Sequence, residues 1–424
     1  MKVVQPPIKS IFSLDLTAMD NEKLSNGTNF FKLVNSELPA FQLDIVIEAG
    51  RLFEKYKMTS KATASLLKEG ASTMNTDVIA ETIDYYGGRI KVWSNMDYIT
   101  LSLSAMSKHA APLISVLFDI YHAATFPQSE FDKFKFIEAQ RLKVSLSKNE
   151  NVAYRHFTQA LYGENHPYGY NSTVEMINDL SLEHVKAHHR NLFIPELTRI
   201  YLGGYIDDAA LNLIKELFGS TKTSKHDASL QHFNQNETRR QTFHLTNKGE
   251  FQSSVMIGRT IIHRRHEDFP ALYMALMLLG GYFGSRLMKE IREELGLTYD
   301  ISCHIEHMKA GSFFYILSDA DSNNVPRLLD EIYHQIHEMQ TSLVDENELT
   351  MVKRYIMGSY MNLTDGMFRR MQFLKALNLD AFEIEEYNEL LQRIYSVGPQ
   401  EIKNASLKYL KKRNLLEIVV GNDD

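Results

Sequence analysis

The sequence predicts an α+β protein of two homologous, duplicated domains, each an antiparallel-rich sheet with helices packed on one face. Three observations point to this class. The chain has 424 residues, enough for two or more domains of ordinary size. Residues 41–49 and 89–104 alternate apolar and polar side chains, as half-buried strands do. The order of helices, strands and turns in the first half recurs in the second half, which indicates duplication.

The first half is predicted to mix strands and helices. Its expected elements are, in order, a strand at 41–49, helices at 59–69 and 76–86, a strand pair at 89–104, helices at 111–124, 129–146, 154–162 and 182–191, and a strand at 197–205. In the strand pair, Thr100, Ser102 and Ser104 share the polar face. This pattern is typical of an antiparallel sheet with one solvated side.

The second half repeats this plan. Its expected elements are a strand at 253–260, helices at 270–279 and 285–295, strands at 297–306 and 312–319, helices at 324–340 and 345–363, a helix beginning at Pro399, and a strand at 415–420. Residues 182–204 are echoed by 399–421. We therefore predict domains at 1–218 and 239–424, joined by a polar linker at 219–238.

Composition excludes several classes of protein. The chain has 53 acidic and 46 basic residues and a formal charge of −7, so it carries no basic footprint for nucleic acid. Its most apolar stretch, 271–284, is too short to span a bilayer. Residues 1–16 lack the apolar core of a signal peptide. We expect a cytoplasmic protein without a membrane partner, with the periplasm as the alternative.

A single cysteine, Cys303, excludes an intrachain disulfide and a cysteine-rich zinc site. It lies in a segment with strand-like sequence. A packed thiol is therefore the better interpretation than a nucleophile.

Residues 280–300 read GGYFGSRLMKEIREELGLTYD and are predicted to form a helix followed by a strand. Leu287, Ile291 and Leu295 give the helix an apolar stripe. Gly296 lies where a left-handed residue ends a helix, because glycine has no side chain to clash there.

Arg292 lies in the last turn of this helix and Tyr299 just inside the strand. Because the turn folds back between them, we expect both side chains to reach one cleft. A structural interpretation fits the same spacing: Arg292 as a cation at a negative helix end, worth ~0.3–1 kcal/mol, and Tyr299 as a half-buried strand residue.

The pattern Gly-Gly-x-x-Gly-Ser-Arg-Leu-x-x-x-Ile-Arg-Glu-x-x-Gly-Leu-x-Tyr resembles the signature of the second domain of the pitrilysin/insulinase family of zinc peptidases. In that family the arginine and tyrosine hold the substrate peptide near the scissile carbonyl. The resemblance therefore implies substrate-binding roles for Arg292 and Tyr299. It covers nearly the whole chain and implies a fold of duplicated α+β domains.

Active members of that family carry His-x-x-Glu-His on the first long helix, where two histidines bind zinc and the glutamate activates water. By resemblance, Lys61 and Ser65 stand at the histidine positions and Ala64 at the glutamate position. A further zinc-binding glutamate should fall within 140–145, which contains no carboxylate. All four chemical positions are lost, so we predict no catalytic zinc and no peptide cleavage by this chain alone.

Other histidines are weaker candidates for a metal site. His184, His188 and His189 lie together on a predicted helix, but no carboxylate is suitably spaced, and a solvated helix face is the preferred interpretation. His304 and His307 are three apart in a strand and point to opposite faces.

The resemblance also implies partners, because the family includes heterodimers in which one subunit keeps the zinc motif and the other keeps the Arg/Tyr pair. We predict the second kind: a non-catalytic subunit with no cofactor of its own, a zinc-bearing homologous partner, and an unfolded peptide as substrate. A homodimer is also compatible with the sequence. The alternatives are a structural subunit or a peptide-sequestering pseudopeptidase with no role in cleavage.

Overall fold

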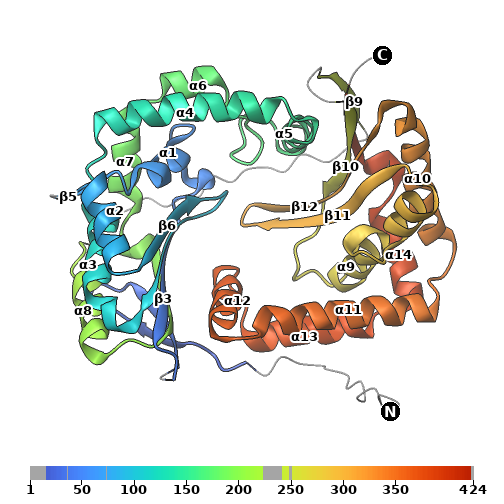
Figure 1. The fold of residues 1–424 in the computed structure, drawn as a ribbon. Coiled ribbons are helices and arrows are strands. Elements are labelled where there is room, and N and C mark those ends of the chain that lie inside the picture. Colours follow the sequence, from blue (N-terminus) through green and yellow to red (C-terminus); the bar gives the residue numbers. More distant parts are fainter. Residues whose placement is uncertain (1–15, 36, 73, 223–240, 248–250, 422–424) are drawn as a thin grey trace, which may run out of the picture. The chain divides into compact units, whose positions relative to one another are not determined.

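The structure is a computed structural model, which describes residues 16–35, 37–72, 74–222, 241–247 and 251–421 (Figure 1). The chain forms two compact units. The N-terminal unit consists mainly of Met19–Met256, and the C-terminal unit mainly of Ile257–His307 and Ser312–Leu415. Most of the predicted linker at 219–238 lies outside the described residues, and the domain boundaries predicted from the sequence stay a prediction.

A six-stranded sheet forms the centre of the N-terminal unit. In spatial order its strands are β1 (Asp20–Lys23), β2 (Asn29–Val34), β8 (Thr198–Gly204), β3 (Ala40–Ile47), β7 (Ile99–Met106) and β6 (Arg89–Ser94). Neighbours pair antiparallel except β2 and β8, which are parallel. The predicted strand pair therefore appears as β6 and β7, with β6 at the edge of the sheet.

Helices gather on one face of this sheet, where α2, α3 and α8 lie side by side in Figure 1. The helices of the unit are α1 (Thr59–Leu66), α2 (Thr76–Tyr85), α3 (Ala110–His122), α4 (Gln128–Leu146), α5 (Asn149–Tyr162), α6 (Val174–Asp179), α7 (Leu182–Leu192) and α8 (Asp208–Gly219). A short hairpin of β4 (Gly70–Ala71) and β5 (Met74–Asn75) follows α1.

The core of the N-terminal unit lies between the sheet and these helices. Leu43, Ile45 and Ile47 alternate along β3 and are fully buried, and Leu113 and Leu117 of α3 belong to the same apolar cluster. A strand repeats every two residues and a helix every three to four, so both sequence patterns deliver their apolar side chains to one layer.

The polar face of β3 and β7 differs from the prediction. Asp44 and Ser102 are buried, so the expectation that this side is solvated is wrong at these positions. Ser102 donates a hydrogen bond of 2.6 Å to Asp44, and Gln42 donates one of 3.0 Å to the same oxygen. Burial of polar groups is tolerated here because they satisfy one another.

A second sheet has five strands. In spatial order they are β11 (Thr298–Met308), β12 (Gly311–Asp321), β10 (Gln252–Thr260), β13 (Leu416–Gly421) and β9 (Gln241–Thr246). The pair β13 and β9 is parallel. Strand β11, which carries Tyr299, is an edge strand of this sheet.

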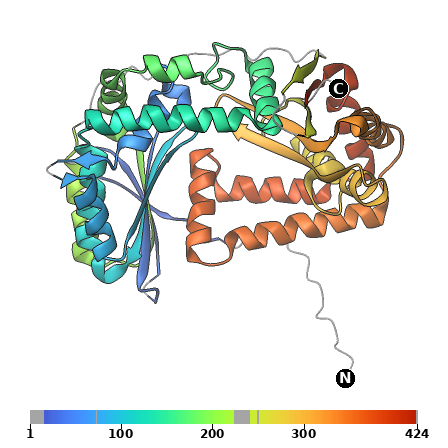
Figure 2. The same cartoon turned by 45° about the horizontal axis from the view of Figure 1, so that its top comes forward.

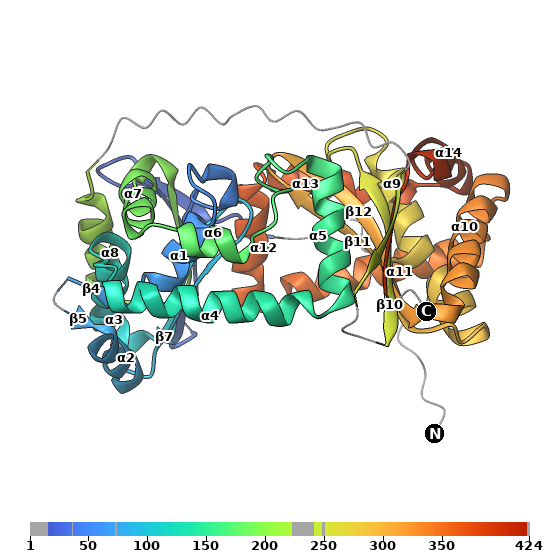
Figure 3. The same ribbon diagram turned by 90° about the horizontal axis from the view of Figure 1, so that it is seen from above.

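The C-terminal unit is rich in helices. They are α9 (Phe269–Leu276), the π-helical segments η4 (Met277–Gly281) and η5 (Met288–Glu294), α10 (Val325–Thr341), α11 (Glu346–Thr364), α12 (Met367–Leu379), α13 (Ile384–Ser396) and α14 (Pro399–Tyr409). Figure 2 shows α12 turning the chain between the two long helices α11 and α13. Helix α14 packs beside α9, as Figure 3 shows from above.

This arrangement of sheets with packed helices confirms the predicted α+β class with two similar domains. Among the described residues, the structure contains no helix that is both long and apolar enough to cross a membrane.

Candidate functional site

Helix α1 carries the residues that stand where the zinc motif would be. Lys61 and Ser65 lie one turn apart on its exposed face, because residues i and i+4 share a helix face. Ala64 is buried, at 5 per cent exposure. The helix therefore has the expected register, and what differs is the chemistry of its side chains.

A buried carboxylate faces this helix. Glu138 of α4 is 3 per cent exposed, and its Oε1 forms an ion pair with the ammonium of Lys61. Its Oε2 is buried and has no hydrogen-bond partner among the described residues. The sequence prediction that no carboxylate serves this position is therefore incomplete. Residues 140–145 do lack one, but Glu138 lies just before them.

A sequence signal for Glu138 did exist. The buried side chains of α4 are Phe131, Phe134, Glu138 and Leu142, which recur every three to four residues. A glutamate within an apolar stripe of this kind faces the core, and a charged group there needs a partner. The window of 140–145, which was set by resemblance, excludes this residue.

These residues do not fit a catalytic zinc ion. The ammonium of Lys61 has no lone pair to donate, Ala64 has no functional group, and Ser65 offers only a neutral hydroxyl. Across the described ranges, no group of three or more histidine, cysteine, aspartate or glutamate side chains is arranged to hold a metal ion.

The prediction of a solvated face for the three histidines of α7 is wrong for His188, which is buried, whereas His184 and His189 are half-buried. His188 is buried and its Nε2 lies 2.9 Å from the carbonyl oxygen of Ala49, and burial lowers its pKa to about 4. The Nε2 of His189 lies 2.8 Å from the carbonyl oxygen of Tyr121, and burial lowers its pKa to about 4 as well. Both rings are neutral packing groups that link α7 to neighbouring segments.

The helix–strand turn that carries the predicted Arg/Tyr pair lies in the C-terminal unit. Its helix is π-helical over Met288–Glu294 rather than α-helical. Gly296 has a φ of +61°, as predicted, and the amide of Leu297 donates a 3.0 Å bond to the carbonyl of Ile291. The chain therefore reverses direction between the helix and β11. π-helical turns are rare and are often found at functional sites.

Arg292 and Tyr299 lie at either end of this turn. Tyr299 is 87 per cent exposed on the second residue of β11, and Arg292 is half-buried near the end of the helix. The guanidinium of Arg292 lies 4.9 Å from the ring centre of Phe283, which is itself 64 per cent exposed. Neither predicted residue is sealed in a core, and an exposed aromatic ring lies beside the arginine.

An ion pair connects the segment just before η5 to helix α11. Arg286 donates two hydrogen bonds of 2.8 Å to the two carboxylate oxygens of Glu348, on α11. These bonds raise the pKa of Arg286. A pocket of about 600 Å³ lies beside the pair, with Tyr282, Glu290 and Glu338 among its lining residues. Sequence patterns did not point to these residues, because their pairing joins distant segments.

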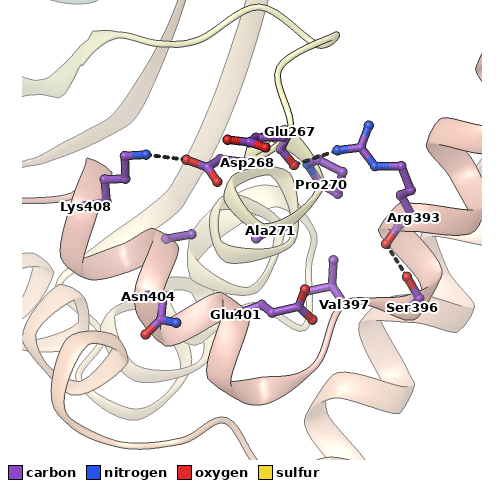
Figure 4. Close-up of a pocket in the computed structure, with 11 residues that line it drawn as sticks. Glu267, Asp268, Pro270, Ala271, Arg393, Ser396, Val397, Glu401, Asn404 and Lys408 are labelled. Atoms are coloured by element: carbon purple, nitrogen blue, oxygen red, sulfur yellow. Dashed lines mark hydrogen bonds and ion pairs between the residues drawn. The ribbon is translucent and has the colours of Figure 1, made fainter.

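A second pocket of the C-terminal unit, of about 390 Å³, lies between the start of α9 and helices α13 and α14 (Figure 4). Its two cationic side chains already have partners. Lys408 contacts Asp268 at 2.5 Å, and Arg393 donates a 2.6 Å bond to the carbonyl of Glu267. Because these lining residues pair with one another, the pocket supports no assignment of function.

Helix α1 thus carries no metal-binding side chain at positions 61, 64 and 65. Comparison with known proteins agrees. The sequence profile named "Peptidase M16 inactive domain" matches residues 179–356. An uncharacterized zinc protease of Bacillus subtilis, YmxG, is 24% identical over 299 residues, which are 69% of this chain and 71% of that protein.

Two further similar proteins, unlike YmxG, carry the word inactive in their names. YmfF of Bacillus subtilis, a probable inactive metalloprotease, is 22% identical over 250 residues, which cover 58% of this chain and 57% of that protein. The crystal structure of a peptidase M16 inactive domain from Pseudomonas fluorescens superimposes with a TM-score of 0.86 at 20% identity, covering 96% of this chain and 98% of that one. The chain is thus similar to zinc proteases and to an inactive metalloprotease in sequence, and to an M16 inactive domain in fold.

Proposed function

We propose that this chain is the zinc-less subunit of a two-subunit metallopeptidase that cleaves unfolded peptides. In this proposal a homologous partner supplies the zinc ion, the attacking water and the general base. This chain supplies Arg292 and Tyr299 as substrate-binding groups. The observation that carries the proposal is the contrast between an accessible Arg/Tyr turn and a helix α1 without metal ligands.

The chemistry of the pair suits a peptide backbone. The guanidinium of Arg292 and the phenol of Tyr299 are both hydrogen-bond donors, and a peptide carbonyl is an acceptor that gains negative charge during hydrolysis. Loss of one donor of this kind typically lowers the rate by ~10²–10³. The exposed ring of Phe283 beside Arg292 would add apolar contact with a peptide side chain.

The relatives support a division of labour without assigning it. One organism, Bacillus subtilis, contributes both a relative named a zinc protease and one named a probable inactive metalloprotease. Such a combination is what a pairing of zinc-bearing and zinc-less homologues requires.

The test uses this chain co-purified with a zinc-bearing homologue from the same cells. We expect the pair to cleave an unfolded peptide, and Arg292→Ala to lower kcat/KM by ~10²–10³. Tyr299→Phe removes one hydroxyl and should lower it as well. Arg327→Ala is the matched control, because Arg327 is an exposed arginine of α10 in the same unit. Its rate should be unchanged.

Two results would reject the proposal. Full activity of an intact Arg292→Ala complex would remove the direct role and leave a structural subunit. Tight peptide binding by the isolated chain, without any zinc-bearing partner, would instead favour the peptide-sequestering alternative.

A further inference from the structure

A cavity of about 510 Å³ lies in the N-terminal unit, where helices α3, α7 and α8 end. We propose that this cavity binds an apolar carboxylic acid, whose body packs on the aromatic floor and whose carboxylate pairs with Arg190 and Lys222. The residues involved all belong to the N-terminal unit. The proposal therefore does not depend on any role of Arg292 or Tyr299.

The floor of the cavity is apolar. Tyr121, Phe193 and Ile194 line it, and each of these residues is at most 8 per cent exposed. The ring centres of Tyr121 and Phe193 lie 5.6 Å apart. Cavities that bind small molecules typically measure roughly 300–1,000 Å³ and combine apolar walls with a few polar groups. The cavity thus has the size and the walls that an apolar ligand requires.

The rim of the cavity carries positive charge. Arg190 and Lys222 are exposed there, and in the part of the chain that the structure describes neither side chain forms an ion pair or a hydrogen bond. The described lining residues include no aspartate or glutamate. An exposed cation without a protein partner, beside an apolar floor, favours a ligand that joins an anion to an apolar body.

A third cation on the rim, His122, is excluded from the proposed pairing. The pKa of Asp119 is raised by desolvation, and the charge of His122 partly offsets this rise. His122 therefore has an acidic neighbour on its own helix. The charge offered to a ligand is assigned to Arg190 and Lys222 alone.

A purely structural role for these cations is the main alternative, because positive side chains stabilise the negative ends of helices. However, the carbonyl groups at this end of the unit already have donors. Tyr121 accepts a 2.8 Å hydrogen bond from Nε2 of His189. The carbonyls of Leu217 and Phe218 accept bonds of 2.7 and 2.9 Å from the hydroxyls of Ser220 and Thr221. Arg190 and Lys222 are therefore not needed to satisfy them.

The test uses the full chain and hydrocinnamate, which joins a phenyl ring to a carboxylate, with the uncharged amide of the same acid for comparison. Isothermal titration calorimetry should show one hydrocinnamate bound per chain. The amide should bind roughly tenfold more weakly, because it keeps the apolar body but lacks the charge. Higher salt should weaken binding of the acid and leave binding of the amide unchanged.

Variants locate the binding. Arg190→Gln/Lys222→Gln should lower the affinity for hydrocinnamate roughly tenfold and leave that for the amide unchanged. Arg89→Gln/Lys91→Gln is the matched control, because it removes one arginine and one lysine that are exposed on β6 of the same unit. Its affinity for hydrocinnamate should equal that of the unchanged chain. All four substituted side chains are exposed, and circular dichroism confirms that each variant is folded.

A peptide that ends in phenylalanine identifies the source of the carboxylate. If its free-acid form binds as tightly as hydrocinnamate and its C-terminal amide does not, the cavity accepts the end of a peptide chain. If only hydrocinnamate binds, the ligand is a free organic acid.

Three results would overturn the inference. The first is a chain that binds no hydrocinnamate. The second is equal affinity for the acid and its amide. The third is a control variant on β6 that loses as much affinity as the variant of Arg190 and Lys222.

Discussion

Helix α1 of the N-terminal unit and the turn from η5 to β11 of the C-terminal unit differ in how their polar side chains are engaged. On α1 the positions for metal chemistry are filled by Lys61, Ala64 and Ser65, and the lysine is tied inward to a buried glutamate. At the other turn, Tyr299 is exposed and Arg292 is reachable from solvent. The difference teaches that the polar side chain of Lys61 is used in a contact within its own unit, whereas the donors of Arg292 and Tyr299 are accessible to solvent.

On the side of α1, the largest expected effect comes from His188 of α7, whose Nδ1 lies 3.2 Å from the hydroxyl oxygen of Thr59 on α1. His188 has a pKa of about 4 in the folded chain and about 6.5 when unfolded, because burial disfavours its charged form. Below pH 6.5 the unfolded chain therefore binds the extra proton. The stability due to His188 is complete above pH 6.5 and is lost as the pH falls towards 4, by about 3 kcal/mol at most.

Urea unfolding between pH 7.5 and 4.5 measures this effect. The neighbouring His189 changes the stability in the same direction, whereas half-buried Glu54, whose pKa desolvation raises to about 7, changes it in the opposite direction. The informative quantity is therefore the slope of the unfolding free energy against pH, compared between a His188→Gln variant and the unchanged chain. Equal slopes would show that His188 is not buried in its neutral form.

The backbone conformation of the turn between η5 and β11 depends on Gly296. Its φ of +61° is strained for a residue with a side chain, although no atom lies within 4 Å of the place that a Cβ would occupy. We expect Gly296→Val to lower the free energy of unfolding by about 1–2 kcal/mol, and Gly296→Asn to cost less because asparagine tolerates this conformation. Thermal unfolding of both variants tests this. Equal costs for valine and asparagine would contradict the backbone explanation.

The smallest expected effect concerns the ion pair between Arg286 and Glu348. Arg286→Lys keeps the charge but loses one of two hydrogen bonds to Glu348, since lysine cannot form the planar fork. We expect a loss of about 1 kcal/mol in unfolding free energy, because the pair is partly exposed. Arg286→Lys in a Glu348→Gln background should cost much less. An undiminished cost there would mean that Arg286 acts through packing instead.

Local patterns carried most of the fold prediction. The alternation at 41–49 and 89–104 located β3, β6 and β7, and the glycine after Leu295 marked the end of its helix. These features depend on neighbours within a few residues, so the order of side chains is enough. The π-helical form of η5 was not predicted, because an apolar side chain at every fourth residue fits the period of an α-helix and that of a π-helix about equally.

The sequence-based predictions failed where contacts join distant segments of the chain. Lys61 and Glu138 are 77 residues apart, and His188 meets a carbonyl 139 residues away. No periodicity within α1 or α7 records such a partner. The result was a missed carboxylate beside Lys61 and three histidines assigned to solvent that are in fact engaged in packing.

The identities of the residues determine by themselves that α1 has no zinc ligands, because lysine, alanine and serine lack the donors that this chemistry requires. They also determine that an arginine and a tyrosine flank a glycine turn. Only the tertiary structure decided that Lys61 has a buried carboxylate as its partner and that Tyr299 is open to solvent. Burial and charge pairing arise where separate segments pack together, and that packing is a property of the folded chain as a whole.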